Sequence, residues 1–151
     1  MQQFRNIEEA YDICLTQGNI IPTEEIDLDR IRSTLRLIEE DLETAKDAIQ
    51  KKRWNSAYKS NYDILHQLTE AFLRFDNIKV KTHLCLFTYL CLKHPELELN
   101  WDFFEKVRTK RNGILYYANS ITEQDWKEVS LPFNLYINQL KNKIKEKLEK
   151  K

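Results

Sequence analysis

The sequence predicts an all-α protein, an antiparallel bundle of about five helices. First, its 151 residues include only 2 glycines and 3 prolines, whereas a sheet protein of this size uses both residues in its many turns. Second, apolar side chains recur at alternating intervals of three and four residues, which places them on one face of a helix. The length matches one domain, residues 1–151, and is enough to bury a core without disulfides or a structural metal.

The first part of the chain, residues 1–22, is expected to form a short N-terminal extension of this domain. Within it, residues 4–17 can form one amphipathic helix. Gly18 and Pro22 follow this segment, and both residue types commonly lie just beyond the end of a helix.

Two long helices are expected next, over residues 28–49 and 54–75. Each carries an apolar stripe with heptad spacing. The connection between them is so short that the two helices should lie antiparallel. The first stripe consists of Leu28, Ile31, Leu35, Ile38, Leu42, Ala45 and Ile49, and the second of Trp54, Ala57, Asn61, Ile64, Leu68, Ala71 and Phe75.

Three further helices complete the expected bundle. Residues 80–93 are apolar on nearly all sides, which is typical of a helix near the centre of a bundle. The other two helices should cover residues 100–118 and 120–148. No apolar run has the length of a membrane span, and Met1 opens a polar segment unlike a leader peptide. No membrane contact is therefore expected.

The cysteines do not have the spacing of a metal or redox site. Cys14, Cys85 and Cys91 are an odd number and contain no closely spaced pair. Cys85 and Cys91 lie in the apolar run and are interpreted as reduced core residues. Reduced cysteines suit a cytoplasmic protein, because disulfides are rare in that compartment.

The three histidines are interpreted as structural. His66 and His83 lie within expected helices and should be packed or hydrogen-bonded, whereas His94, next to Pro95, should be exposed. No two of them have the i, i+4 spacing that binds a metal on a helix, and the chain has no glycine-rich phosphate loop. No metal and no cofactor are therefore expected.

Charge is unevenly distributed along the chain. Residues 1–50 carry 12 acidic and 5 basic side chains, whereas residues 51–151 carry 12 and 19. Such asymmetry can mark a basic surface for an anionic partner. An acidic helix that pairs with basic helices of the same chain is an equal alternative, because blocks of sequence do not map directly onto surface patches.

The segment KVRTKRNGILYYAN, residues 106–119, holds the strongest candidate site. Arg111 falls within the apolar stripe of the expected helix, where an uncharged side chain is the rule. Its guanidinium matches the geometry of phosphate, and asparagine and tyrosine can hydrogen-bond to a nucleotide and stack on it. Arg108, Arg111, Asn112 and Tyr117 are therefore predicted to bind a nucleotide or a phosphate.

A structural interpretation of the same residues stays open. Arg111 can pair with a buried carboxylate of the acidic helix at residues 28–49, since ion pairs commonly explain an arginine in an apolar stripe. Asn112 and Gly113 can simply end the helix.

Three stretches of the chain resemble the HEPN family (higher eukaryotes and prokaryotes nucleotide-binding domain). They are residues 38–73, the segment VKTHLCLFTYL at residues 80–90, and KRNGILYYAN at residues 110–119. The last resembles the Arg-Asn-x-x-x-His segment of that family. The resemblance implies an antiparallel helical bundle that forms a homodimer. It also implies either a metal-independent RNase or a binding module, often paired with a small nucleotidyltransferase partner.

The resemblance gives Arg111 a phosphate-holding role and Asn112 a positioning role. The histidine position of the family falls on Tyr116, which makes Arg111 and Tyr116 the candidate catalytic residues. A phenol, with a reference pKa of about 10, is a poor general base at neutral pH, and no histidine follows His94.

Three functions are expected in order of preference. The first is a catalytically inactive module that binds RNA, a nucleotide or a partner, as the HEPN component of a nucleotidyltransferase-paired toxin–antitoxin system. The second is a metal-independent RNase toxin that uses Arg111 and Tyr116. The third is a structural helical adaptor in which Arg111 is a buried ion pair.

Overall fold

The computed structural model describes residue 4 and residues 6–151. It confirms the all-α prediction, with six α-helices in the described residues, one short 3-10 helix and one pair of short strands. Within the same residues, no helix combines the length and apolarity required to cross a membrane. In chain order the elements are α1 (Ile7–Thr16), β1 (Ile20–Pro22), α2 (Leu28–Gln50), α3 (Trp54–Arg74), β2 (Ile78–Val80), α4 (His83–Lys93), η1 (Pro95–Leu97), α5 (Trp101–Tyr117) and α6 (Glu123–Glu149).

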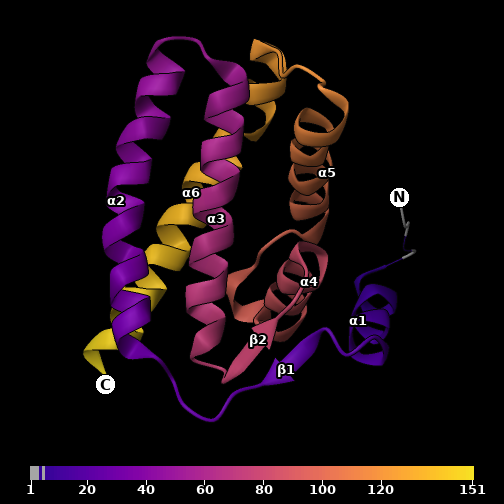
Figure 1. The fold of residues 1–151 in the computed structure, drawn as a ribbon, viewed down its shortest axis with the longest axis vertical. Coiled ribbons are helices and arrows are strands. Elements are labelled where there is room, and N and C mark those ends of the chain that lie inside the picture. Colours follow the sequence, from indigo (N-terminus) through magenta and orange to yellow (C-terminus); the bar gives the residue numbers. More distant parts are fainter. Residues whose placement is uncertain (1–3, 5) are drawn as a thin grey trace.

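α2 and α3 form the predicted antiparallel pair, and α6 lies behind them (Figure 1). The apolar stripes that predicted these helices face the core. The fully or nearly fully buried members are Ile31, Ile38 and Ala45 of α2, and Ala57, Ile64, Leu68 and Ala71 of α3. On α6 the buried stripe consists of Trp126, Val129, Phe133, Ile137, Leu140 and Ile144.

The short helix α4 lies between α1 on one side and α3 and α5 on the other (Figure 1). It begins at His83, later than the predicted start at residue 80, because Val80 belongs to β2 and pairs with Ile20 of β1. The side chain of Thr82 caps the helix by accepting a hydrogen bond from the Cys85 amide at 3.2 Å. The strand pair thus joins the N-terminal segment to the connection between α3 and α4.

A disulfide between Cys14 and Cys85 fastens α1 to α4. Both cysteines are buried, and 71 positions of sequence separate them. The expectation of a reduced Cys85 is therefore wrong, and the cytoplasmic location receives no support from it. The packing of α1 against α4 creates the pair, and spacing along the chain carries no signal of it. Cys91 remains a free, half-buried thiol, as expected.

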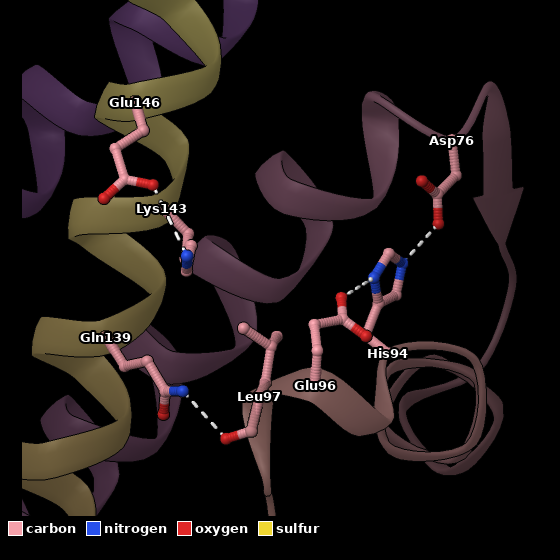
Figure 2. A network of polar contacts seen from close by, with 7 residues as sticks. All are labelled: Asp76, His94, Glu96, Leu97, Gln139, Lys143 and Glu146. Atoms are coloured by element: carbon pink, nitrogen blue, oxygen red, sulfur yellow. Dashed lines mark hydrogen bonds and ion pairs between the residues drawn. The ribbon is translucent and has the colours of Figure 1, made fainter.

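His94 closes the other end of α4 and connects three segments (Figure 2). Its Nε2 lies 2.6 Å from Asp76 Oδ2, just after α3, and its Nδ1 lies 2.9 Å from Glu96 Oε1 in η1. Only 13% of the side chain is exposed, so the expectation of an exposed His94 is wrong. Pro95 starts the turn of η1, and that turn brings Glu96 back onto the ring.

Candidate functional site

Arg111 extends from α5 toward α3. Its guanidinium carbon lies 5.1 Å from the centroid of the Tyr62 ring, within the range of a cation–π contact. Its Nη2 lies 3.5 Å from Asp63 Oδ1. The structural interpretation of Arg111 correctly predicts that this residue pairs with a carboxylate. The carboxylate, however, belongs to α3 rather than to the acidic α2, and it is half-exposed rather than buried.

Tyr62 connects Arg111 to two histidines. The Tyr62 hydroxyl lies 2.8 Å from Nδ1 of His83, the first residue of α4. His66 lies one turn after Tyr62 on α3, and the centroids of the His66 and His83 rings are 3.9 Å apart. Three helices therefore place two imidazoles, tilted by 32° relative to each other, near one guanidinium. We call Tyr62, His66, His83 and Arg111 the Arg–His cluster.

Both imidazoles of the cluster are neutral at pH 7. Burial lowers the pKa of His66 to about 4, and the charge of Arg111 acts in the same direction. Burial also lowers the pKa of His83 to about 4, assisted by His66 and Arg111. The contact of His66 Nε2 with Glu70 Oε1 at 3.3 Å is therefore not an ion pair at neutral pH. Neutral imidazoles can accept a proton, but they have no acidic proton to give.

Tyr62 keeps its proton. Burial raises the pKa of its phenol, although Arg111 and Arg108 oppose the shift. A protonated phenol can donate to Nδ1 of the neutral His83, which assigns the remaining ring proton to Nε2. The hydrogen bond thus holds the ring of His83 in place.

Arg108 lies one turn before Arg111 on α5, and one edge of its guanidinium is paired with Glu105. Its Nε donates to Glu105 Oε1 at 3.1 Å and its Nη2 to Glu105 Oε2 at 2.9 Å. A two-point arginine–carboxylate contact of this kind is among the stronger surface interactions. The charge of Arg108 still acts on both Tyr62 and His83.

The other predicted residues lie farther along α5. Asn112 is half-buried, whereas Tyr116 and Tyr117 are 72% and 77% exposed. In the described residues, no hydrogen bond or ring contact joins these three side chains to the Arg–His cluster. The structure therefore brings together Arg111 and, more loosely, Arg108, but it does not bring the two tyrosines to them.

The helix continues through Asn112 and Gly113, so the alternative that these residues end it is wrong. Instead, Ala118 adopts a left-handed conformation with φ of 54°, and its amide donates to the Gly113 carbonyl. A larger residue in place of Gly113 would require only a small shift of the exposed Asn119 side chain. A Cβ at this position would lie 3.2 Å from Nδ2 of Asn119, closer than ordinary van der Waals contact.

All four basic side chains between residues 106 and 111 are paired with carboxylates of the same chain. Lys106 donates to Glu128 at 3.0 Å and Lys110 to Asp125 at 2.9 Å. Arg108 and Arg111 pair as described above. The intramolecular alternative for the basic segment thus describes these four side chains, although their partners belong to α3, α5 and α6. Between α6 and the acidic α2, Lys141 donates to Glu39 at 2.8 Å.

The histidine pair is not predicted from the sequence. The family resemblance places a histidine after Arg111 on the same helix, whereas the imidazoles come from α3 and α4. One signal was present: Tyr62 and His66 have i, i+4 spacing and so share a face of α3. The described residues contain no group of histidine, cysteine and carboxylate side chains that could hold a metal. No family model, curated protein or solved structure matches this chain.

Proposed function

We propose that this protein binds RNA or nucleotides by holding a phosphate at the Arg–His cluster. In this proposal the chain is a HEPN-like module that acts as a homodimer and is paired with a small nucleotidyltransferase. The all-helical bundle is compatible with a HEPN-like fold. The proposal depends on one observation: Arg111 and two neutral imidazoles converge at the surface where α3, α4 and α5 meet.

The state of Arg111 supports phosphate binding. A guanidinium has five N–H donors, and in the described residues Arg111 makes a single long hydrogen bond, 3.5 Å to Asp63. The Asp63 side chain is 53% exposed, and burial raises the pKa of its carboxyl although Arg111 opposes the shift. A phosphate with two parallel contacts would bind the fork better than this carboxylate does. Neutral His66 and His83 add donors and acceptors for phosphate or ribose oxygens.

The protonation states favour binding over cleavage. Metal-independent cleavage of a phosphodiester needs a general base and a general acid. At pH 7 the pair of imidazoles provides a base but no acid, since both pKa values are about 4. Tyr116, the catalytic residue that the family resemblance implies, is 72% exposed and has no described contact with the cluster.

Binding of labelled single-stranded RNA, measured by fluorescence anisotropy at two salt concentrations, tests the proposal. Arg111→Ala should weaken binding about tenfold or more and reduce the salt dependence by about one ion. Asp63→Asn removes the competing carboxylate and should bind equally or more tightly. Arg53→Ala is the matched control, because Arg53 is an exposed arginine at the turn between α2 and α3.

The same variants separate binding from a purely structural role. A structural Arg111 predicts that Arg111→Ala and Asp63→Asn lower the melting temperature alike while neither changes RNA affinity. That pattern would overturn the proposal and leave a helical adaptor.

A metal-independent RNase is the second candidate, because the two imidazoles lie 3.9 Å apart beside an arginine. A bound phosphate would raise both pKa values and so could create the missing acid. RNA cleavage in EDTA measures this activity. Cleavage lost in His66→Ala and His83→Ala but kept in Tyr116→Phe would assign it to the histidine pair. Cleavage lost only in Tyr116→Phe would assign it to the phenol. No cleavage by the wild type would leave the binding function.

Consecutive apolar and aromatic side chains at the end of α5 support a protein partner. Leu115, Tyr116 and Tyr117 are all exposed, and exposed groups of this kind commonly mark interaction surfaces. Light scattering of the wild type and of a Leu115→Ser variant measures the homodimer that the proposal includes.

A further inference from the structure

A basic pocket separate from the Arg–His cluster lies at the C-terminal end of α3. A cavity of about 70 Å³ opens between the first turn of α2, the last turn of α3 and β2. Three cationic residues line it, Arg30, Arg74 and Lys79, and Glu70 is the only acidic residue in its lining. The apolar part of the wall consists of Leu73, Ile78, Val80 and Leu86.

The three cations form no ion pair. In the described part of the chain, the charged groups of Arg30, Arg74 and Lys79 make no ion pair or hydrogen bond. This contrasts with residues 106–111, where every basic side chain pairs with a carboxylate. Burial lowers the pKa of Arg74, and the neighbouring charge of Arg30 lowers it further. Like charges held this close favour an anion between them.

The carboxylates that act on Arg74 already have other contacts. Glu70 lies 3.3 Å from His66, and Asp27 caps α2 by accepting from the Arg30 amide at 3.0 Å. The first turn of α2 also favours a negative ligand, because a helix N-terminus carries partial positive charge. His66 is neutral at pH 7, so Glu70 and Asp27 both keep their negative charges; three cations against two carboxylates leave the pocket with a net charge of one positive unit.

The cavity has the size of a small oxyanion. Each water-sized group needs roughly 10–15 Å³ of such volume, so 70 Å³ takes about five to seven of them, and a phosphate group has five heavy atoms. Guanidinium groups bind phosphate oxygens in pairs. We propose that the pocket of Arg30, Arg74 and Lys79 binds a phosphoryl group and acts as a second anchor for the RNA strand bound at Arg111.

The spacing of the two anchors fits one strand. Arg74 follows His66 by eight residues on α3, which corresponds to about 12 Å along the helix. A stacked strand covers that length with about three to four nucleotides. A groove between α2 and α3 continues from the pocket, with Arg30, Ser33, Leu37, Gln67 and Glu70 in its lining. The continuity of the strand rests on the proposed RNA-binding function, whereas the phosphate pocket does not.

Inorganic phosphate tests the phosphate pocket, and RNA oligonucleotides of two lengths test the second anchor. Inorganic phosphate, titrated while backbone amide shifts are recorded by NMR, should shift residues 30, 74 and 79 in the wild type and in Arg111→Ala. The shifts should disappear in Arg74→Gln and in Arg30→Ala, and persist in the control Arg36→Ala, whose exposed guanidinium contacts only Ser33. Circular dichroism of each variant verifies folding. No shift in the folded wild type would overturn the pocket.

The length of the RNA tests the second anchor. A hexanucleotide spans both sites, so Arg74→Gln should weaken its binding about tenfold. A dinucleotide at Arg111 should lose nothing in the same variant. Equal hexanucleotide affinity in Arg74→Gln and wild type, with the phosphate shifts intact, would show a site for free phosphate and overturn the anchor. If the wild type binds no RNA but still shows the phosphate-induced amide shifts, the proposed function is overturned and the phosphate pocket remains.

Discussion

The two ends of α4 each carry a histidine, and the pKa values of the two histidines are shifted in opposite directions. His83 begins the helix, and burial together with His66 and Arg111 lowers its pKa to about 4. His94 ends the helix. Burial alone would lower its pKa, but hydrogen bonds to Asp76 and Glu96 outweigh burial and raise it. The helix dipole supports both pKa shifts. It disfavours a cation at the N-terminus, where His83 lies, and favours one at the C-terminus, where His94 lies.

The difference separates a structural site from a candidate functional site. His94 has a carboxylate on each ring nitrogen (Figure 2), so it joins α3, α4 and η1 and neither nitrogen is free for a ligand. His83 has one nitrogen bonded to Tyr62 and one that no described hydrogen bond uses. A histidine whose neighbours keep it neutral and incompletely bonded is the one able to meet a ligand.

Breaking the disulfide should affect the His83 end of α4 far more than the His94 end. Cys85 lies two residues after His83, and its bond to Cys14 closes a long loop. Loss of that bond should lower the free energy of unfolding by about 2–4 kcal/mol. Hydrogen exchange of the Cys14→Ser/Cys85→Ser variant should accelerate over residues 83–88 and α1, with a smaller change over residues 90–94.

Cys91→Ser is the matched control for this experiment. Cys91 is free, and burial raises the pKa of its thiol to about 12, so the variant should keep the disulfide and the exchange pattern of the wild type. Equal acceleration at both ends of α4 in the double variant would show that the ends are not independent.

Acid should distinguish the histidines directly. The chain has three, and NMR titration of their ring protons should give two pKa values near 4 and one above 6.5. For His66 and His83 the folded pKa is lowered, so the unfolded state takes up protons first as the pH falls below about 6.5. Their contribution to stability is therefore full above that pH and lost between about 6.5 and 4.

Urea denaturation measures the size of this acid effect. Between pH 7 and 5 each of the two histidines should cost about 2 kcal/mol of unfolding free energy, and the pair about 4 kcal/mol. Over the same pH interval, the unfolding free energy of the His66→Gln/His83→Gln variant should fall by less than that of the wild type, and the difference should equal the contribution of the pair. The comparison corrects for the carboxylates that titrate in both proteins. If the two rings titrate near 6.5, the neutral pair and the argument for binding over cleavage are both wrong.

The histidine pair also shows where sequence-based prediction ends. The helices followed from local periodicity, so Ile31 and Leu68 could be placed in the core from spacing alone. Arg111 stood out because it broke that periodicity. The contact between His66 and His83 depends instead on how α3 and α4 pack, and so does the bond between Cys14 and Cys85. Such non-local pairs leave no periodic signal in one sequence.

The smallest effect is expected at His94, and its dependence on pH has the opposite sign. The folded pKa is raised, so the stabilising contribution is fully present below about 6.5 and is lost as the pH rises through the folded value. His94→Gln should lower the free energy of unfolding by about 1–2 kcal/mol at pH 6, because Asp76 loses its cationic partner. At pH 9 the difference should shrink, because only neutral hydrogen bonds remain to be lost.

Asp76→Asn supplies the test of this mechanism. Combined with His94→Gln in a double-mutant cycle, it should show coupling at pH 6 that falls at pH 9. Coupling that does not change with pH would mean that His94 acts as a neutral hydrogen-bonding residue. The two ends of α4 would then differ in packing alone, and the charge at the C-terminal end would have no part in holding α3, α4 and η1 together.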